Sequence, residues 1–142
     1  MFKSKDQKIE LLRNVPLFSA CSKQELARIA ALTDHVEIKA GTVLTREGEP
    51  GNEAFIIASG KAEATLRGER LNVLGPGSAV GEMALLDRSP RSATVTAKDD
   101  LHVLVLDPRS FGAMIDETPT VARKIMQALA QRLRELEKAP TY

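Results

Sequence analysis

The sequence holds very little cysteine, almost no net charge and no long hydrophobic run. Cys21 stands alone and cannot form an internal disulfide, which favours a reducing, cytoplasmic location. Twenty basic residues against 19 acidic ones leave a net charge of +1, so the chain lacks the basic footprint of a protein that binds a long phosphate backbone. The apolar runs 54–58 and 83–86 are far shorter than the ~20 residues that span a bilayer. The charged start, 1–6, has no apolar segment of the kind that directs export.

What the sequence does contain is ordinary for a folded protein. Of its 142 residues, 43% are hydrophobic and 27% are charged, which excludes a disordered or collagen-like chain. A chain of this size buries roughly 70% of its unfolded surface and forms a core without disulfides. We therefore expect one domain over 1–142.

Glycine placement divides the chain into three parts. Eight of the nine glycines lie within 41–81, separated by short apolar runs that are typical of strands and tight turns. Residues 62–67 and 93–98 alternate between apolar and polar with period two, and 101–106 is apolar on both faces except at His102. These patterns predict an antiparallel β-sandwich (jelly-roll) over about 33–107, flanked by N-terminal helices within about 1–32 and C-terminal helices within about 108–138.

The flanks carry helix signals. Ser22 and Glu25 stand at the spacing of a capping box. Pro108, which follows Asp107, and Pro119 suit first helical positions. The last helix has an apolar seam at heptad spacing, too short to predict a coiled coil alone. The seam consists of Ala122, Met126, Leu129, Leu133 and Leu136.

The most informative stretch is 81–95, because a short run of helix-forming residues there is followed by an arginine. Residues 83–86 favour a short helix, and the Ser89-Pro90 pair stops it. The amides at the start of such a helix form an anion site, and the Arg91 guanidinium can fork onto two phosphate oxygens. Glu82 suits a ligand that also offers a hydroxyl, such as a ribose 2′-OH. The stretch thus predicts a nucleotide with one phosphate charge.

The order Gly-Glu-x-Ala-Leu followed by Pro-Arg-Ser-Ala resembles the phosphate-binding cassette of cyclic nucleotide-binding domains. Those domains occur in the catabolite activator protein, the kinase regulatory subunit and cyclic-nucleotide-gated channels. Residues 53–62 resemble the family's central hairpin, 74–78 the turn into the cassette and 46–51 an earlier glycine turn. The resemblance covers about 16–137.

The resemblance implies a role for each residue of the cassette, 81–93. Glu82 accepts from the ribose 2′-OH, Arg91 neutralises the cyclic phosphate, and Ser92 hydrogen-bonds it. The register with bacterial channel domains makes Arg132 the candidate for a lid that stacks on the base. The ligand-binding residues implied are Gly81, Glu82, Met83, Ala84, Leu85, Arg91, Ser92 and Ala93.

The function implied is that of a non-catalytic cAMP sensor that moves its C-terminal helices. cGMP is the alternative ligand, because a hydroxyl after the arginine, here Ser92, can contact the guanine 2-amino group. A ligand-independent regulatory or interaction subunit is a second hypothesis, and a jelly-roll enzyme is a third, although the sequence offers no recognisable nucleophile and base. With the chain ending at Tyr142, we expect no DNA-recognition module. Output is expected through an unidentified protein partner or a homodimer formed by the C-terminal helix.

Simpler interpretations stand beside these. Arg91 and Glu82 could form a surface salt bridge around an empty turn, and Arg132 could be an ordinary exposed residue. His35 and His102 lie far apart in sequence, so no metal site is expected. Cys21 fits a packed, unreactive thiol, and the apolar seam fits packing against the sandwich.

Overall fold

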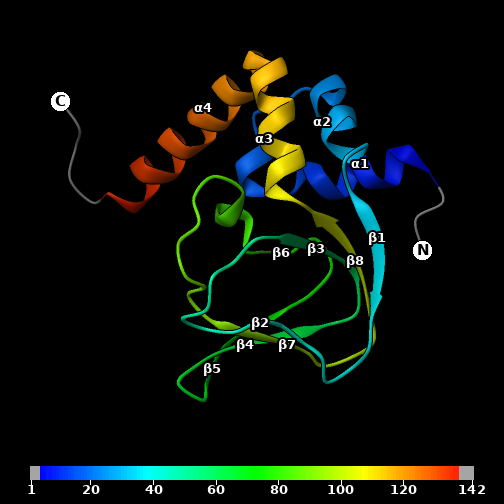
Figure 1. Ribbon diagram of the computed structural model, residues 1–142, viewed down its shortest axis with the longest axis vertical. Coiled ribbons are helices and arrows are strands. Elements are labelled where there is room, and N and C mark those ends of the chain that lie inside the picture. Colours follow the sequence, from blue (N-terminus) through cyan, green and yellow to red (C-terminus); the bar gives the residue numbers. More distant parts are fainter. Residues whose placement is uncertain (1–3, 138–142) are drawn as a thin grey trace.

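The computed structural model describes residues 4–137 (Figure 1). Its elements follow in the order α1 (Lys5–Arg13), η1 (Pro16–Phe18), α2 (Lys23–Ala30), β1 (Asp34–Ile38), β2 (Val43–Thr45), β3 (Ala54–Ser59), β4 (Ala62–Leu66), β5 (Glu69–Leu74), β6 (Ala79–Val80), η2 (Glu82–Leu85), β7 (Thr94–Ala97), β8 (Leu101–Leu106), α3 (Pro108–Glu117) and α4 (Pro119–Leu136). The expected ranges 1–32 and 108–138 include residues 1–3 and 138, which lie outside the described residues.

Two four-stranded antiparallel sheets form the centre of the molecule, in the orders β1-β8-β3-β6 and β2-β7-β4-β5. Figure 1 shows the α-helices gathered at one end of the sandwich, with the last turns of α4 extending away from it. The prediction of a mainly β sandwich with helices before and after it in the sequence is therefore confirmed.

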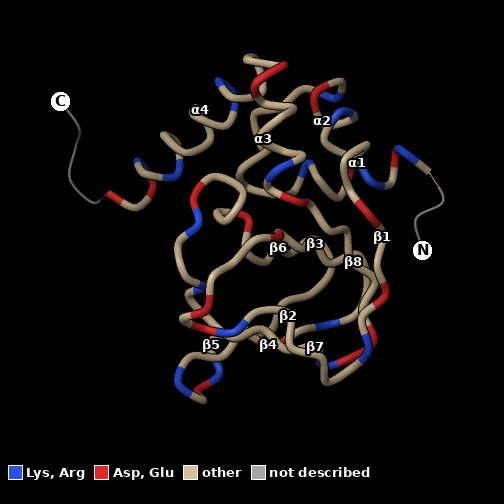
Figure 2. Tube along the Cα trace, in the orientation of Figure 1, with Lys and Arg blue, Asp and Glu red and all other residues tan. Residues whose placement is uncertain are grey.

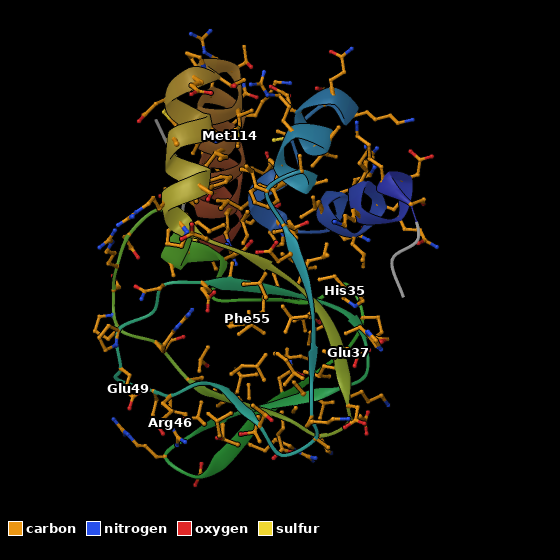
Figure 3. The ribbon with its side chains drawn as sticks, turned by 45° about the vertical axis from the view of Figure 1, so that its right-hand side comes forward. His35, Glu37, Arg46, Glu49, Phe55 and Met114 are labelled. Atoms are coloured by element: carbon orange, nitrogen blue, oxygen red, sulfur yellow. The ribbon has the colours of Figure 1, made fainter. Side chains whose placement is uncertain are left out.

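Strands β3 and β8 are buried on both faces, which explains their continuous apolar runs. Ile56 and Leu104 belong to a core that faces the helices. Phe55 and Val103, one residue along each strand, belong to a second core that also includes residues of β4 and β7. Figure 3 shows Phe55 in the space between the sheets. Because successive side chains in a strand point to opposite faces, one pair of central strands serves both cores.

The predicted caps form. The Ser22 amide donates to Glu25 Oε1 at 2.7 Å, and the Glu25 amide donates to Ser22 Oγ at 3.2 Å, completing the capping box of α2. Asp107 caps α3 ahead of Pro108. Glu25 also accepts from Lys124 Nζ at 3.4 Å, so α4 is tied to the N-terminal helices near its start.

The apolar seam of α4 packs against the core only in part: Leu129 does so, whereas Met126, Leu133 and Leu136 are exposed. The buried face of the helix is instead Val121, Ile125 and Ala128. Met126 and Leu133 are 61% and 60% exposed. Met126 is exposed because it lies off this buried face. The last turns of the helix, which carry Leu133 and Leu136, project beyond the body (Figure 1).

The two histidines meet although 67 positions separate them in sequence. His35 Nε2 lies 2.8 Å from His102 Nδ1 across the β1–β8 pair. Residues 4–137 contain no group of three or more side chains that could hold a metal ion. Cys21 is buried, and burial, aided by the Glu25 carboxylate, raises the pKa of its thiol to about 11.

Charged residues of both signs are interspersed along the loops and helices, as Figure 2 shows. This distribution agrees with the near-zero net charge. Within residues 4–137, none of the helices combines the length and the apolar character needed to cross a membrane.

Candidate functional site

A cavity of about 470 Å³ opens between the two sheets beside η2. This volume is within the range of small-molecule sites. Its wall combines residues from β2, β5, β6 and β7 with residues of 81–93. The lining consists of Thr45, Leu74, Ala79, Val80, Gly81, Met83, Ala84, Asp87, Ser89, Pro90, Arg91, Ser92, Ala93 and Val95.

The short helix after Gly81 is a single 3₁₀ turn, η2, rather than a longer α-helix. Gly81 adopts a left-handed conformation with φ of 71°, which favours glycine. The Ala84 amide donates to the Gly81 carbonyl and the Leu86 amide to the Met83 carbonyl, both at 3.0 Å. Such a tight turn places residue 83 and residue 84 on the cavity wall within one turn of the glycine.

Arg91 is enclosed between two glycines. Its backbone amide donates to the Glu49 carbonyl, and its carbonyl accepts from the Gly48 amide, each at 2.8 Å, so the β2–β3 loop fixes its backbone. A Cβ atom on Gly51 or on Gly81 would overlap the guanidinium side chain. Both glycines are therefore needed for the guanidinium to lie where it does.

The Arg91 guanidinium keeps an unused donor. Nη2 donates to the Glu53 carbonyl at 2.7 Å, whereas Nη1 is buried and has no hydrogen-bond partner among the described residues. Burial lowers the pKa of Arg91, and the Glu53 carboxylate opposes that shift, but an arginine remains charged at neutral pH. A buried, unpaired cationic donor is costly to leave unsatisfied, so this position is suited to an anion.

Glu82 is engaged on the side away from the cavity. It is buried, with Oε1 accepting from Arg132 Nη1 at 3.1 Å and Oε2 accepting from the Leu17 amide at 3.3 Å. Arg132 is thus the salt-bridge partner of Glu82, and the simpler interpretation of an Arg91–Glu82 surface bridge is wrong. The Glu82 carboxylate joins η1, η2 and α4.

Of the residues that the sequence nominated, the structure brings six to the cavity wall: Gly81, Met83, Ala84, Arg91, Ser92 and Ala93. Glu82 and Leu85 are buried next to it, and Arg132 reaches it only through Glu82 and Met83. Arg88 is exposed.

Sequence reasoning missed residues that contact the site although they lie far from 81–93 in the sequence. Thr45 lines the cavity, and its Oγ1 donates to the Ala93 carbonyl at 3.0 Å. Gly51 lies in a turn that the sequence marked, but the turn gave no sign of contact with Arg91. The Glu53 contact uses a backbone carbonyl, which no side-chain pattern can reveal.

The comparisons with known proteins agree with this geometry. Residues 35–118 match the family model described as cyclic nucleotide-binding domain. The cAMP-dependent protein kinase regulatory subunit of Emericella nidulans is 35% identical over 115 residues, covering 80% of this chain and 28% of that protein.

Two solved structures are also similar. The N-terminal domain of a transcriptional regulator from Streptomyces coelicolor has a TM-score of 0.80 and 32% identity, covering 89% of this chain and 92% of that one. The regulatory domain of Toxoplasma gondii PKA, solved with cAMP, has a TM-score of 0.70 and 34% identity, covering 77% of this chain and 43% of that one.

The chain spans 28% to 38% of the length of three curated relatives that it matches. The family model, however, matches more than half of the chain, and the S. coelicolor domain is covered almost completely. This chain belongs to the family of cyclic nucleotide-binding domains.

Proposed function

We propose that the domain is a non-catalytic cAMP sensor that binds its ligand in the cavity beside η2. The observation that carries the proposal is the Nη1 atom of Arg91, which is buried next to Gly81 and has no partner in the part of the chain that the structure describes. The Toxoplasma regulatory domain, solved with cAMP, supports the choice of ligand. We include in the proposal that 1–142 works as one domain and that its location is cytoplasmic.

In this proposal the cyclic phosphate contacts Arg91 Nη1, the amides at the start of η2 and the Ser92 hydroxyl, while Ala93 leaves room beside it. The ribose 2′-OH donates to Glu82, whose carboxylate turns from Arg132 toward the cavity when the ligand binds. cGMP is the alternative ligand, because the Ser92 hydroxyl lies on the cavity wall where it can contact a guanine amino group. Competitive titration with both nucleotides separates the two.

The contacts of α4 suggest how binding is reported. Near its start, Lys124 ties the helix to Glu25 of the N-terminal bundle; near its end, Arg132 ties it to Glu82 of the cassette. A ribose hydroxyl on Glu82 changes only the second tie. Because a ligand shifts an equilibrium only through unequal affinity for two states, we propose that cAMP repositions the last turns of α4 and frees Arg132 to cover the base.

Amide exchange measured with and without saturating cAMP tests this switch. We expect the ligand to change exchange in 119–136 of the wild type. In Arg132→Gln that change should largely disappear, because the variant lacks the tie between Glu82 and α4. Arg134→Gln, on the same exposed turns, is the matched control and should behave like the wild type. Equal exchange with and without cAMP in the wild type would contradict the switch.

Absence of catalysis is part of the proposal. After prolonged incubation with the protein, cAMP should be recovered intact; release of AMP at a rate proportional to protein concentration would contradict it. Direct DNA binding is not proposed, because the charges of both signs are interspersed over the described residues.

We further propose that the exposed seam of α4 is the contact for a second copy of the chain or for a protein partner. Leu133 and Leu136 are 60% and 73% exposed on the projecting turns. Leu133→Glu should give a folded protein with the mass of a monomer by light scattering, and Gln131→Glu should keep the wild-type mass. A wild type that is already monomeric, or a dimer that survives Leu133→Glu, would exclude the homodimer.

A further inference from the structure

The cavity wall carries a carboxylate that the roles described so far do not use. Of the described residues that line it, Arg91 is the one cation and Asp87 the one acidic residue. Asp87 is held on both sides: its amide donates to the Met83 carbonyl at 3.0 Å, and its Oδ1 accepts from the Ser89 amide at 3.3 Å. The carboxylate therefore has a defined place in the loop that follows η2.

The described residues on the cavity wall carry one positive charge, on Arg91, and one negative charge, on Asp87. One guanidinium with one donor, Nη1, that has no partner among the described residues lines the same cavity as one exposed carboxylate. A fixed negative charge near an anion site weakens binding in proportion to the charge of the ligand. An anion with two charges is thus penalised about twice as much, in free energy, as an anion with one.

Cyclic and linear nucleoside monophosphates differ in this respect. A cyclic phosphodiester has one ionisable oxygen and carries one negative charge. A phosphomonoester has a second ionisation near pH 6 and carries close to two at neutral pH and above. The same base and sugar can thus be told apart by charge alone.

We propose that Asp87 is a specificity-determining residue that makes the cavity reject dianionic linear nucleotides such as 5′-AMP in favour of monoanionic cyclic ones. The inference rests on the proposed function, because it assumes that the phosphate lies at Arg91. Asp87 contributes nothing to affinity for cAMP in this account; it lowers affinity for both ligands and lowers that for the linear nucleotide more.

Titration calorimetry of wild type and Asp87→Asn with cAMP and 5′-AMP, at pH 7.5 and low salt, tests the inference. We take a separation of about 10 Å between the Asp87 carboxylate and the phosphate, and an effective dielectric constant of about 40. Removing the carboxylate charge then tightens cAMP binding about 4-fold and 5′-AMP binding about 16-fold. The preference for cAMP should therefore fall about 4-fold. Asp116→Asn, which removes a charge from α3 outside the cavity wall, should leave the preference unchanged.

The outcomes are distinguishable. If Asp87→Asn leaves the preference for cAMP over 5′-AMP unchanged, the inference is overturned and the proposed function stays intact. The same holds if Asp87→Asn weakens cAMP binding, which would mean that the carboxylate accepts a hydrogen bond from the ligand. A wild type that binds neither nucleotide would overturn both. Screening provides a second readout: the effect of Asp87→Asn should shrink as ionic strength rises.

Discussion

Arg91→Ala is expected to weaken cAMP binding by roughly 30- to 1000-fold, the largest loss of any single substitution in the cassette. Hydrogen bonds from a charged donor to a charged acceptor contribute about 2–4 kcal/mol when the site is shielded from water. Among residues 4–137, the side chain is hydrogen-bonded only to the Glu53 carbonyl, and Nη1 is buried without a partner. Its removal should therefore leave the thermal unfolding temperature nearly unchanged while binding is lost.

Two variants make the result specific. Arg91→Lys keeps the charge but not the fork, so it should retain part of the affinity. Arg88→Ala removes an exposed guanidinium that does not line the cavity, and calorimetry should give the wild-type dissociation constant. A dissociation constant that Arg91→Ala leaves unchanged would remove Arg91 from the site.

Gly51→Ala should weaken cAMP binding by about 10- to 100-fold although residue 51 does not line the cavity. The added Cβ would overlap the Arg91 side chain, so the guanidinium must move from the place that Gly51 and Gly81 leave for it. Displacing a charged donor from its acceptor loses about 1.5–3 kcal/mol.

Gly75→Ala is the matched control. A Cβ there would meet nothing within 4 Å, and neither Gly51 nor Gly75 has the positive φ that an alanine would strain. The two substitutions therefore differ in the contact with Arg91. In an Arg91→Ala background, Gly51→Ala should have no further effect on affinity, because residues that act through one group are not additive. A full additional loss in that background would show that Gly51 acts by another route.

Much of the fold could be predicted because its signals are local. The Ser22–Glu25 box, the prolines at 108 and 119, and the glycines of 41–81 each mark a boundary through the backbone conformation that they favour. The burial of β8 on both faces follows from the apolar residues on both faces of 101–106, and the same rule accounts for β3. The seam of α4 misled for two reasons. Its heptad spacing included Met126 but not Val121, Ile125 and Ala128, which form the buried face. Periodicity also does not show how far the body extends beneath a helix.

The candidate site also combines features that local sequence reveals with features that it does not. The order of Gly81, Glu82, Arg91 and Ser92 is visible in the sequence, since one continuous segment carries it. The partners that give these residues their geometry come from elsewhere in the chain: Gly51 and Glu53 enclose Arg91, and Leu17 and Arg132 hold Glu82. Long-range contacts of this kind depend on sheet register and on backbone atoms, which residue types do not encode one by one.

The pairing of Glu82 with Arg132 changes the interpretation of both residues. The resemblance gave Glu82 to the ribose and Arg132 to the base, as separate contacts. The structure joins Glu82 and Arg132 at 3.1 Å, so the proposed function has the sugar hydroxyl compete with the last helix for one carboxylate. This is why the proposed switch predicts a change at α4 for a ligand that binds beside η2.

A crystal structure of the protein with cAMP tests the central claim most directly. The account predicts the cyclic phosphate in the cavity beside η2, with one of its oxygens about 2.7–2.9 Å from Nη1 of Arg91 and that side chain still held between Gly51 and Gly81. A structure with the nucleotide bound elsewhere, or with the phosphate out of reach of Nη1, would contradict it.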